Sequence, residues 1–168
     1  SSPNLSGGGG VYAVGTDDGA VPCNSLFTNC RFENNHAIPF GGAVFIRPGN
    51  NMTFNDCSFV NNTATDQGGG VYNDSNNSTF LNCTFDGNTA DEEGGGMYNM
   101  QSNPSVEGCD FLNNVADERG GGMFNYNSAA LVTNCIFQDN IACCNGYGGG
   151  GMYIEYADPV LTNCIFTG

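Results

Sequence analysis

Apolar residues recur in this chain at a long fixed interval and show no helical period. A cysteine returns every 26 to 29 residues, at Cys30, Cys57, Cys83, Cys109, Cys135 and Cys164. An apolar residue stands three positions before each cysteine and a phenylalanine two positions after it, with a variable residue between the cysteine and the phenylalanine. This alternation predicts short strands in which cysteine and phenylalanine point to one side and the variable residue points to the other.

Further columns follow the cysteine at constant spacing. Three residues after the phenylalanine, five copies carry an asparagine: Asn35, Asn62, Asn88, Asn114 and Asn140. Asparagine tolerates left-handed backbone and bonds its own turn, so this column predicts a row of identical corners. A glycine-rich step then leads to Val or Met and an aromatic residue: Tyr12, Phe45, Tyr72, Tyr98, Phe124 and Tyr153. The glycines can reverse the alternation, which leaves open whether these rings face the core or form an outer stripe.

A coil of about 26 residues, with short strands and Gly and Asn corners, is typical of a solenoid whose coils stack on one another. We therefore predict an all-β fold, a right-handed single-stranded parallel β-helix of about six coils. Residues 1–168 form one domain in this interpretation, with coils that begin near residues 8, 41, 68, 94, 120 and 149 and with uncapped ends. A propeller is disfavoured because its blades need about 40 residues.

Two short motifs carry a family resemblance. Gly41-Gly42-Ala43-Val44 fits the pattern GGA[I/L/V], and Gly68-Gly69-Gly70-Val71 fits it with Gly in place of Ala. The pattern F-x-x-N occurs five times, from Phe32–Asn35 to Phe137–Asn140. Together they resemble the repeat of the polymorphic outer-membrane proteins, which are adhesin-like autotransporters. The resemblance spans nearly the whole chain and implies a β-helical surface or adhesive protein with no catalytic residues; Met after the glycines in three coils departs from the pattern.

The charge balance limits the partners. The chain has 168 residues, a net charge of −14 and no lysine, and its only strong bases are Arg31, Arg47 and Arg119. Nucleic acid and anionic membranes are excluded, because binding to phosphates needs clustered Lys and Arg. No apolar run reaches the roughly 20 residues that a membrane span requires, so no membrane insertion is expected. Cations and neutral sugars remain acceptable partners.

The chain is expected to be an extracellular glycoprotein. Seven sequons have the form N-x-[S/T], at Asn4, Asn51, Asn61, Asn73, Asn76, Asn77 and Asn82, and each is a candidate for an N-linked glycan. The acidic surface and the nine cysteines also favour secretion. The sequence shows no signal peptide and does not begin with Met, which fits a mature chain or an excerpt.

The cysteines divide into two groups. The six column cysteines are expected in the core as small apolar thiols, since in-register parallel side chains bridge poorly. Cys23, Cys143 and Cys144 lie outside the column, in the two coils that carry insertions. Exposed thiols in an oxidising compartment tend to pair. One hypothesis joins Cys23 to Cys143 or Cys144 of the next copy, and the alternative is a vicinal Cys143–Cys144 bridge.

Asp66, Glu92 and Glu118 form an acidic column just before the glycines. Stacked carboxylates repel one another and attract cations, and a cluster of oxygen ligands suits Ca²⁺. The alternative, which we favour because no ligand loop of defined spacing is present, is a solvated acidic edge that Arg119 partly offsets near Glu93.

The two ends of the chain fit each other. In the regular coils, the Val or Met that follows the glycines lies 14 residues after the column cysteine. If a second copy followed directly after Gly168, its Val11 would lie 15 residues after Cys164. An arbitrary cut from a longer array explains this match, and so does a head-to-tail homopolymer. Six coils about 4.8 Å apart predict a rise of about 29 Å per copy. The main hypothesis is therefore a non-catalytic subunit or segment of an extracellular filament.

Two alternatives stay open. A cell-surface adhesin would use the solenoid as a stalk and bind through the insertions at 13–24 and 141–148. A polysaccharide lyase or hydrolase needs paired carboxylates, or Ca²⁺ with a basic residue. Asp17-Asp18 is the only Asp pair, His36 is the only histidine, and Arg31 and Arg47 have no companion lysine. These residues give weak support to an enzyme, so no catalytic residue is assigned.

Overall fold

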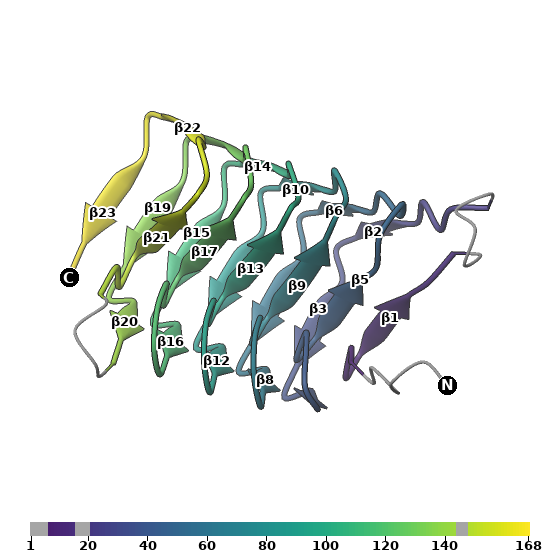
Figure 1. Cartoon of the computed structure of the whole chain (residues 1–168), viewed down its shortest axis with the longest axis horizontal. Helices are drawn as coiled ribbons and strands as arrows, with labels where there is room; N and C mark the ends of the chain where they lie inside the picture. Colours follow the sequence, from purple (N-terminus) through teal and green to yellow (C-terminus); the bar gives the residue numbers. More distant parts are fainter. Residues whose placement is uncertain (1–6, 16–20, 144–147) are drawn as a thin grey trace.

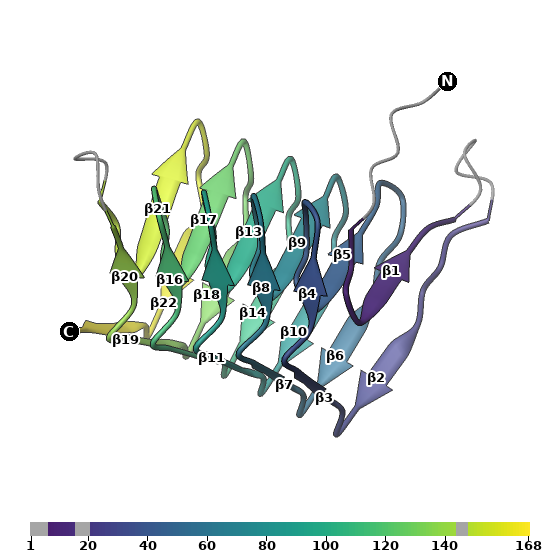
Figure 2. The same cartoon turned by 90° about the horizontal axis from the view of Figure 1, so that it is seen from below.

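The computed structural model describes residues 7–15, 21–143 and 148–168. Its strands form four parallel sheets that run along a single axis (Figures 1 and 2). The chain visits the four sheets in turn and then returns to the first sheet one coil further on. The fold is thus an all-β, right-handed parallel β-helix, which confirms the fold class that the sequence predicts.

The first two sheets have six strands each. The first sheet contains β1 (Val11–Ala13), β5 (Val44–Ile46), β9 (Val71–Asp74), β13 (Met97–Met100), β17 (Met123–Tyr126) and β21 (Met152–Glu155). The second contains β2 (Leu26–Thr28), β6 (Thr53–Asn55), β10 (Thr79–Leu81), β14 (Ser105–Glu107), β18 (Leu131–Thr133) and β22 (Val160–Thr162).

The third sheet again has six strands and the fourth has five. The third contains β3 (Arg31–Glu33), β7 (Ser58–Val60), β11 (Thr84–Asp86), β15 (Asp110–Leu112), β19 (Ile136–Gln138) and β23 (Ile165–Thr167). The fourth contains β4 (His36–Ala37), β8 (Thr63–Ala64), β12 (Thr89–Ala90), β16 (Val115–Ala116) and β20 (Ile141–Ala142). The described residues therefore make five complete coils and a sixth coil of three strands.

Equivalent residues lie directly above one another. Phe85 pairs with Phe59 on one side and with Phe111 on the other, and its ring is stacked 4.6 Å from each of them. A slip of one residue would turn these rings outward, so the phenylalanines fix the register of the third sheet. The main core is built from such columns of Phe, Cys, Val and Met, and every coil repeats the same apolar burial.

The aromatic column after the glycines forms a second apolar cluster. Phe45, Tyr72, Tyr98 and Phe124 are at most 5% exposed, but they pack apart from the main core. Val44 and Ile46 on either side of Phe45 belong to the main core, so the rings project from the opposite face of the first sheet. Phe40 packs against Phe45 and Tyr72 from outside. The question that the sequence left open is thus resolved, because the rings face outward and are covered by the loops before the glycines.

The asparagine column has a different role from the one that the sequence suggested. Asn62, Asn88 and Asn114 are fully buried and point inward. Nδ2 of Asn88 donates to Oδ1 of Asn114 at 2.9 Å and to the carbonyl oxygen of Phe59 at 2.9 Å. We call the column Asn35, Asn62, Asn88, Asn114 and Asn140 the first asparagine ladder.

The left-handed corner lies one residue earlier. Asn34, Asn61, Gly87, Asn113 and Asp139 have φ between 52° and 65°. The expectation that the ladder asparagines themselves adopt this conformation was therefore wrong. The preceding residue makes the turn, which frees the ladder side chain to enter the core and satisfy buried polar groups.

Candidate functional site

The C-terminal end of the coil stack exposes side chains that are core residues in every inner coil. Leu161 and Phe166 are 37% and 46% exposed, whereas their equivalents one coil earlier, Val132 and Phe137, are 0% and 1% exposed. Figure 1 shows β21, β22 and β23 as the last strands of their sheets, with no further coil beyond them. This end presents an apolar surface and the unpaired edges of parallel strands.

A hollow of about 210 Å³ lies in the same end face. It is bordered by Phe137 and Asn140 of the fifth coil and by Gly151, Phe166 and Gly168 of the sixth. The fourth strand of a complete sixth coil would occupy this position, because β20 is the last strand of the five-stranded sheet.

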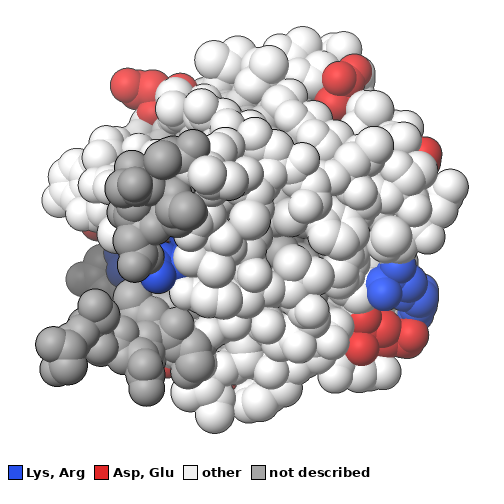
Figure 3. Space-filling model, turned by 90° about the vertical axis from the view of Figure 1, so that its right-hand side faces the viewer, with Lys and Arg blue, Asp and Glu red and all other residues white. Residues whose placement is uncertain are grey.

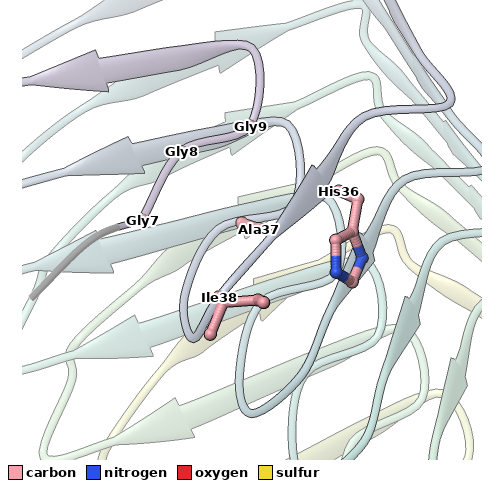
Figure 4. Close-up of a pocket in the computed structure, with 6 residues that line it drawn as sticks. All are labelled: Gly7, Gly8, Gly9, His36, Ala37 and Ile38. Atoms are coloured by element: carbon pink, nitrogen blue, oxygen red, sulfur yellow. The ribbon is translucent and has the colours of Figure 1, made fainter.

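At the N-terminal end of the described residues, β1, β2, β3 and β4 are the first strands of their sheets. Figure 3 looks onto this end, where most of the surface outside the grey residues is neither acidic nor basic. A second hollow, of about 320 Å³, is lined by Gly7, Gly8, Gly9, His36, Ala37 and Ile38 (Figure 4). Nδ1 of His36 lies 2.8 Å from Oγ1 of Thr63, so the ring rests against the next coil. The two hollows thus lie at opposite ends of the stack of described coils.

The column cysteines line the main core. Cys57, Cys83, Cys109 and Cys135 are at most 2% exposed, while Cys30 and Cys164 in the end coils are partly exposed. The Sγ atoms donate to carbonyl oxygens; Cys83, for example, bonds Leu81 and Phe54 at 3.4 and 3.5 Å. Hydrogen bonds with Cys135 and Cys83, together with burial, raise the pKa of the Cys109 thiol. The geometry and burial of the four inner thiols are those of packing groups in the core.

The described cysteines outside the column are free thiols. Sγ of Cys23 donates to the carbonyl oxygen of Val14 at 3.0 Å, and both Cys23 and Cys143 are partly exposed. Cys144 lies outside the described residues, and so does any vicinal bridge that it would form. Among the described residues, no disulfide joins two cysteines of one copy.

The acidic column forms a row without converging on a point. Burial and the charges of Asp66 and Glu118 raise the pKa of Glu92, which places the three carboxylates within electrostatic reach of one another. Over the described part of the chain, no three His, Cys, Asp or Glu side chains gather as metal ligands. The row is therefore a negative edge, and calcium binding there remains a prediction.

Arg119 forms a partly buried charged cluster with two glutamates. Its guanidinium pairs with Glu93 and, at 2.6 Å, with Glu155, and it lies over the rings of Phe124 and Tyr153 at 5.3 and 5.4 Å. Burial raises the pKa of Glu93, and the Arg119 charge opposes that effect. The cluster covers part of the outer aromatic column, which indicates a structural role.

The sequons differ in accessibility. The side chains of Asn51, Asn61, Asn77 and Asn82 are exposed, and Asn4 lies outside the described residues. Asn73 and Asn76 are only 0% and 4% exposed. Nδ2 of Asn73 donates to Asn99 and that of Asn76 to the carbonyl oxygen of Ile46, so a glycan on either has no room in this fold. The expectation of glycans at these two positions is corrected accordingly.

Among the described residues, those weighed for catalysis do not come together. Asp17 and Asp18 lie outside the described residues. Arg31 forms an exposed ion pair with Glu33 at 2.7 Å, and Nη1 of Arg47 contacts the Tyr12 hydroxyl at 3.4 Å. The described strands and loops also contain no helix long and apolar enough to span a membrane.

The described residues define a solenoid with an apolar core and a covered aromatic column. The family model described as "Right handed beta helix region" matches residues 6–168, so the chain belongs to the right-handed β-helix family. No curated protein and no solved structure matches the chain. Adhesins, pectate lyases and structural proteins share this fold, which means that family membership alone does not assign a function.

Proposed function

We propose that this chain is a non-catalytic extracellular structural protein whose copies stack head to tail into a filament. The observation that carries the proposal is the in-register parallel stacking of successive coils, in which the ring of Phe85 lies 4.6 Å from those of Phe59 and Phe111. Because each coil offers its neighbour the same strand edges and the same apolar columns, a second copy could pair with a terminal coil as one coil pairs with the next. An exposed edge of this kind is a template for another strand.

The symmetry of the fold supports a filament. All strands within a sheet are parallel, so the edge at one end of the stack is complementary to the edge at the other end and differs from it. Contact between such ends is heterologous and does not close, which produces a chain of copies. Glycans on the exposed sequons Asn51, Asn61, Asn77 and Asn82 would shield the sides against lateral pairing.

A variant at the C-terminal end tests the proposal. Leu161→Asp places a charge in the stacking surface, where it would have to be buried without a partner. The matched control is Leu131→Asp, the same change at an exposed, outward position of an inner coil. We expect sedimentation to show long assemblies for the wild type and Leu131→Asp, and monomers that retain the β-sheet circular dichroism spectrum for Leu161→Asp. Monomeric wild-type protein at every concentration would refute the proposal.

The adhesin and polysaccharide-cleaving alternatives have less support from the structure. The insertions that an adhesin would use, 13–24 and 141–148, lie partly outside the described residues. Binding of the wild type to cells or glycan arrays would favour the first alternative, and cleavage of pectin or alginate would favour the second.

A further inference from the structure

Tyr156 departs from the pattern of the corner that follows the first sheet. In the preceding coils this corner is formed by Ser75, Gln101 and Asn127, whose φ angles lie between 49° and 52°. Tyr156 has the same left-handed backbone, with a φ of 50°. This conformation is unfavourable for a bulky aromatic residue. Residues that are held in it cluster at ligand sites and switches, so Tyr156 is a candidate for such a role.

The ring of Tyr156 faces solvent. It is 79% exposed, the highest value among the exposed large apolar side chains of the described residues. Gln101 and Asn127 are exposed as well, although a coil lies on each side of both of them. The exposure of this corner is therefore a property of the lateral surface of the solenoid.

Tyr126 lies against Tyr156 and completes a surface that we call the aromatic corner. The two ring centroids are 6.0 Å apart and the ring planes cross at 88°. Tyr126 is partly buried, and its neighbours in register are Met100 in one coil and Glu155 in the next. The faces of aromatic rings carry negative potential. A cation placed between two rings at this separation can lie within about 6 Å of both centroids, which is the range of a cation–π contact.

The aromatic corner adjoins an excess of negative charge. Oε2 of Glu155 accepts from Nη1 of Arg119 at 2.6 Å, and Arg119 also pairs with Glu93. Two carboxylates thus face one guanidinium, which leaves the cluster formally negative. The guanidinium lies over the rings of Phe124 and Tyr153, at 5.3 and 5.4 Å from their centroids. This face of the sheet therefore already holds one cation against aromatic rings.

We propose that Tyr126 and Tyr156 form a binding site for a quaternary ammonium group. The methyl groups of the ligand would pack on the two ring faces, and the negative cluster would favour its positive charge. A primary ammonium or a guanidinium needs acceptors for its N–H groups, and Glu155 already accepts from Arg119. A quaternary ammonium has no N–H groups to satisfy. The site lies on the side of the solenoid, so it is independent of the proposed filament.

Choline is the probe for this site, and 3,3-dimethyl-1-butanol is the control ligand because it has the same shape and no charge. Saturation transfer from the protein to the methyl protons of each ligand is measured at increasing ligand concentration, a readout that serves monomers and filaments alike. We expect choline binding to saturate in the millimolar range and the neutral ligand to bind about fivefold more weakly, since cation–π contacts at exposed rings are modest.

Two variants assign the binding to the aromatic corner. Tyr156→Asn gives this corner the residue that Asn127 supplies one coil earlier, so we expect an unchanged circular dichroism spectrum and choline binding weakened about fivefold or more. Tyr156→Phe keeps the ring face and should bind choline within about twofold of the wild type. Equal affinity for the two ligands, unchanged choline binding by Tyr156→Asn or a signal that does not saturate would each overturn the site.

A flotation assay with phosphatidylcholine vesicles distinguishes the two sources of such a group. Vesicle binding that free choline displaces would assign the ligand to a lipid headgroup. Choline binding without vesicle binding would assign it to a soluble molecule, and both results uphold the site.

Discussion

Nδ2 of Asn99 donates a hydrogen bond to Oδ1 of Asn125 at 2.9 Å, inside the main core. Asn73 donates to Asn99 in the same way at 2.8 Å, so these three residues form a second asparagine ladder. It ends where the equivalent residue is isoleucine, at Ile46 before Asn73 and at Ile154 after Asn125. Oδ1 of Asn73 and Nδ2 of Asn125 are consequently buried without a hydrogen-bond partner in the described structure.

The unpaired amide of Asn125 predicts a stabilising substitution. Ile154→Asn would place an acceptor opposite Nδ2 of Asn125, and it would sacrifice little apolar burial because Ile154 is 46% exposed. We expect the free energy of unfolding in urea to rise by about 1 kcal/mol, the net value of one hydrogen bond. Ile154→Leu is the control, since it keeps an apolar side chain and adds no acceptor. Equal stability of the two variants would contradict this interpretation of the second ladder.

We expect the protein to lose much of its stability when the first asparagine ladder is interrupted. Asn88 accepts from the backbone N–H and Nδ2 of Asn62 and donates to Phe59 and Asn114. Asn88→Leu leaves several of these buried partners unsatisfied, at about 1 to 3 kcal/mol for each group. We expect the free energy of unfolding to fall by about 3 kcal/mol or more, while Asp91→Ala on the exposed loop should change it by less than about 0.5 kcal/mol. A change of similar size in both variants would show that the ladder contributes little.

The acidic column predicts that removing the charge of Glu92 stabilises the fold in a pH-dependent way. Because burial and the neighbouring carboxylates raise the pKa of Glu92 in the folded state, its ionisation opposes folding. The stability associated with the protonated form is complete below the unfolded pKa and is lost as the pH rises through the folded pKa. Glu92→Gln should therefore raise the melting temperature at pH 7, by an amount equivalent to about 0.5 kcal/mol or less after solvent screening. The gain should vanish at pH 3.5, and high salt should reduce it.

A gain from Glu92→Gln that persists unchanged at pH 3.5 would contradict the electrostatic explanation. Melting of the wild type with and without Ca²⁺ tests the calcium prediction in the same assay. A rise in melting temperature that requires Glu92 would support a bound cation, and no rise would leave the row as a solvated edge.

Thiol reactivity should separate the two groups of cysteines. Cys23 and Cys143 are partly exposed, whereas Cys57, Cys83, Cys109 and Cys135 are at most 2% exposed. Because a reagent cannot reach a buried sulfur, a disulfide reagent should modify the first pair in the native protein and the four core thiols only after unfolding. Rapid modification of Cys83 or Cys109 without denaturant would contradict the packed core.

A non-reducing gel tests the covalent link between copies. Oxidised assemblies should yield dimers or longer species that Cys23→Ser abolishes, if Cys23 bridges Cys143 or Cys144 of the next copy. Only monomers on the gel would contradict this bridge.

The sequence predicted the coil because its information is strictly periodic. The spacing from Cys57 to Phe59 and from Phe59 to Asn62 recurs in the neighbouring coils, and the side chains stack as that period requires. The doublets Asn34-Asn35 and Asn61-Asn62 concealed which asparagine makes the turn. Only the pairs Gly87-Asn88 and Asp139-Asn140 distinguish the two positions, since a different residue there takes the left-handed conformation.

Other features depend on contacts that periodicity does not encode. The aromatic column is buried because Phe40 and the Arg119 cluster fold over it, and this tertiary contact is independent of strand alternation. The second ladder did have a sequence signal, an asparagine two residues after Val71, Met97 and Met123.

Electron cryomicroscopy of the purified chain at high concentration tests the central claim most directly. If coils continue from one copy into the next, the images should show unbranched filaments with a meridional reflection near 4.8 Å and a subunit rise of about 29 Å, the height of six coils. Separate particles one copy long, or filaments whose 4.8 Å repeat does not run along the axis, would contradict the account.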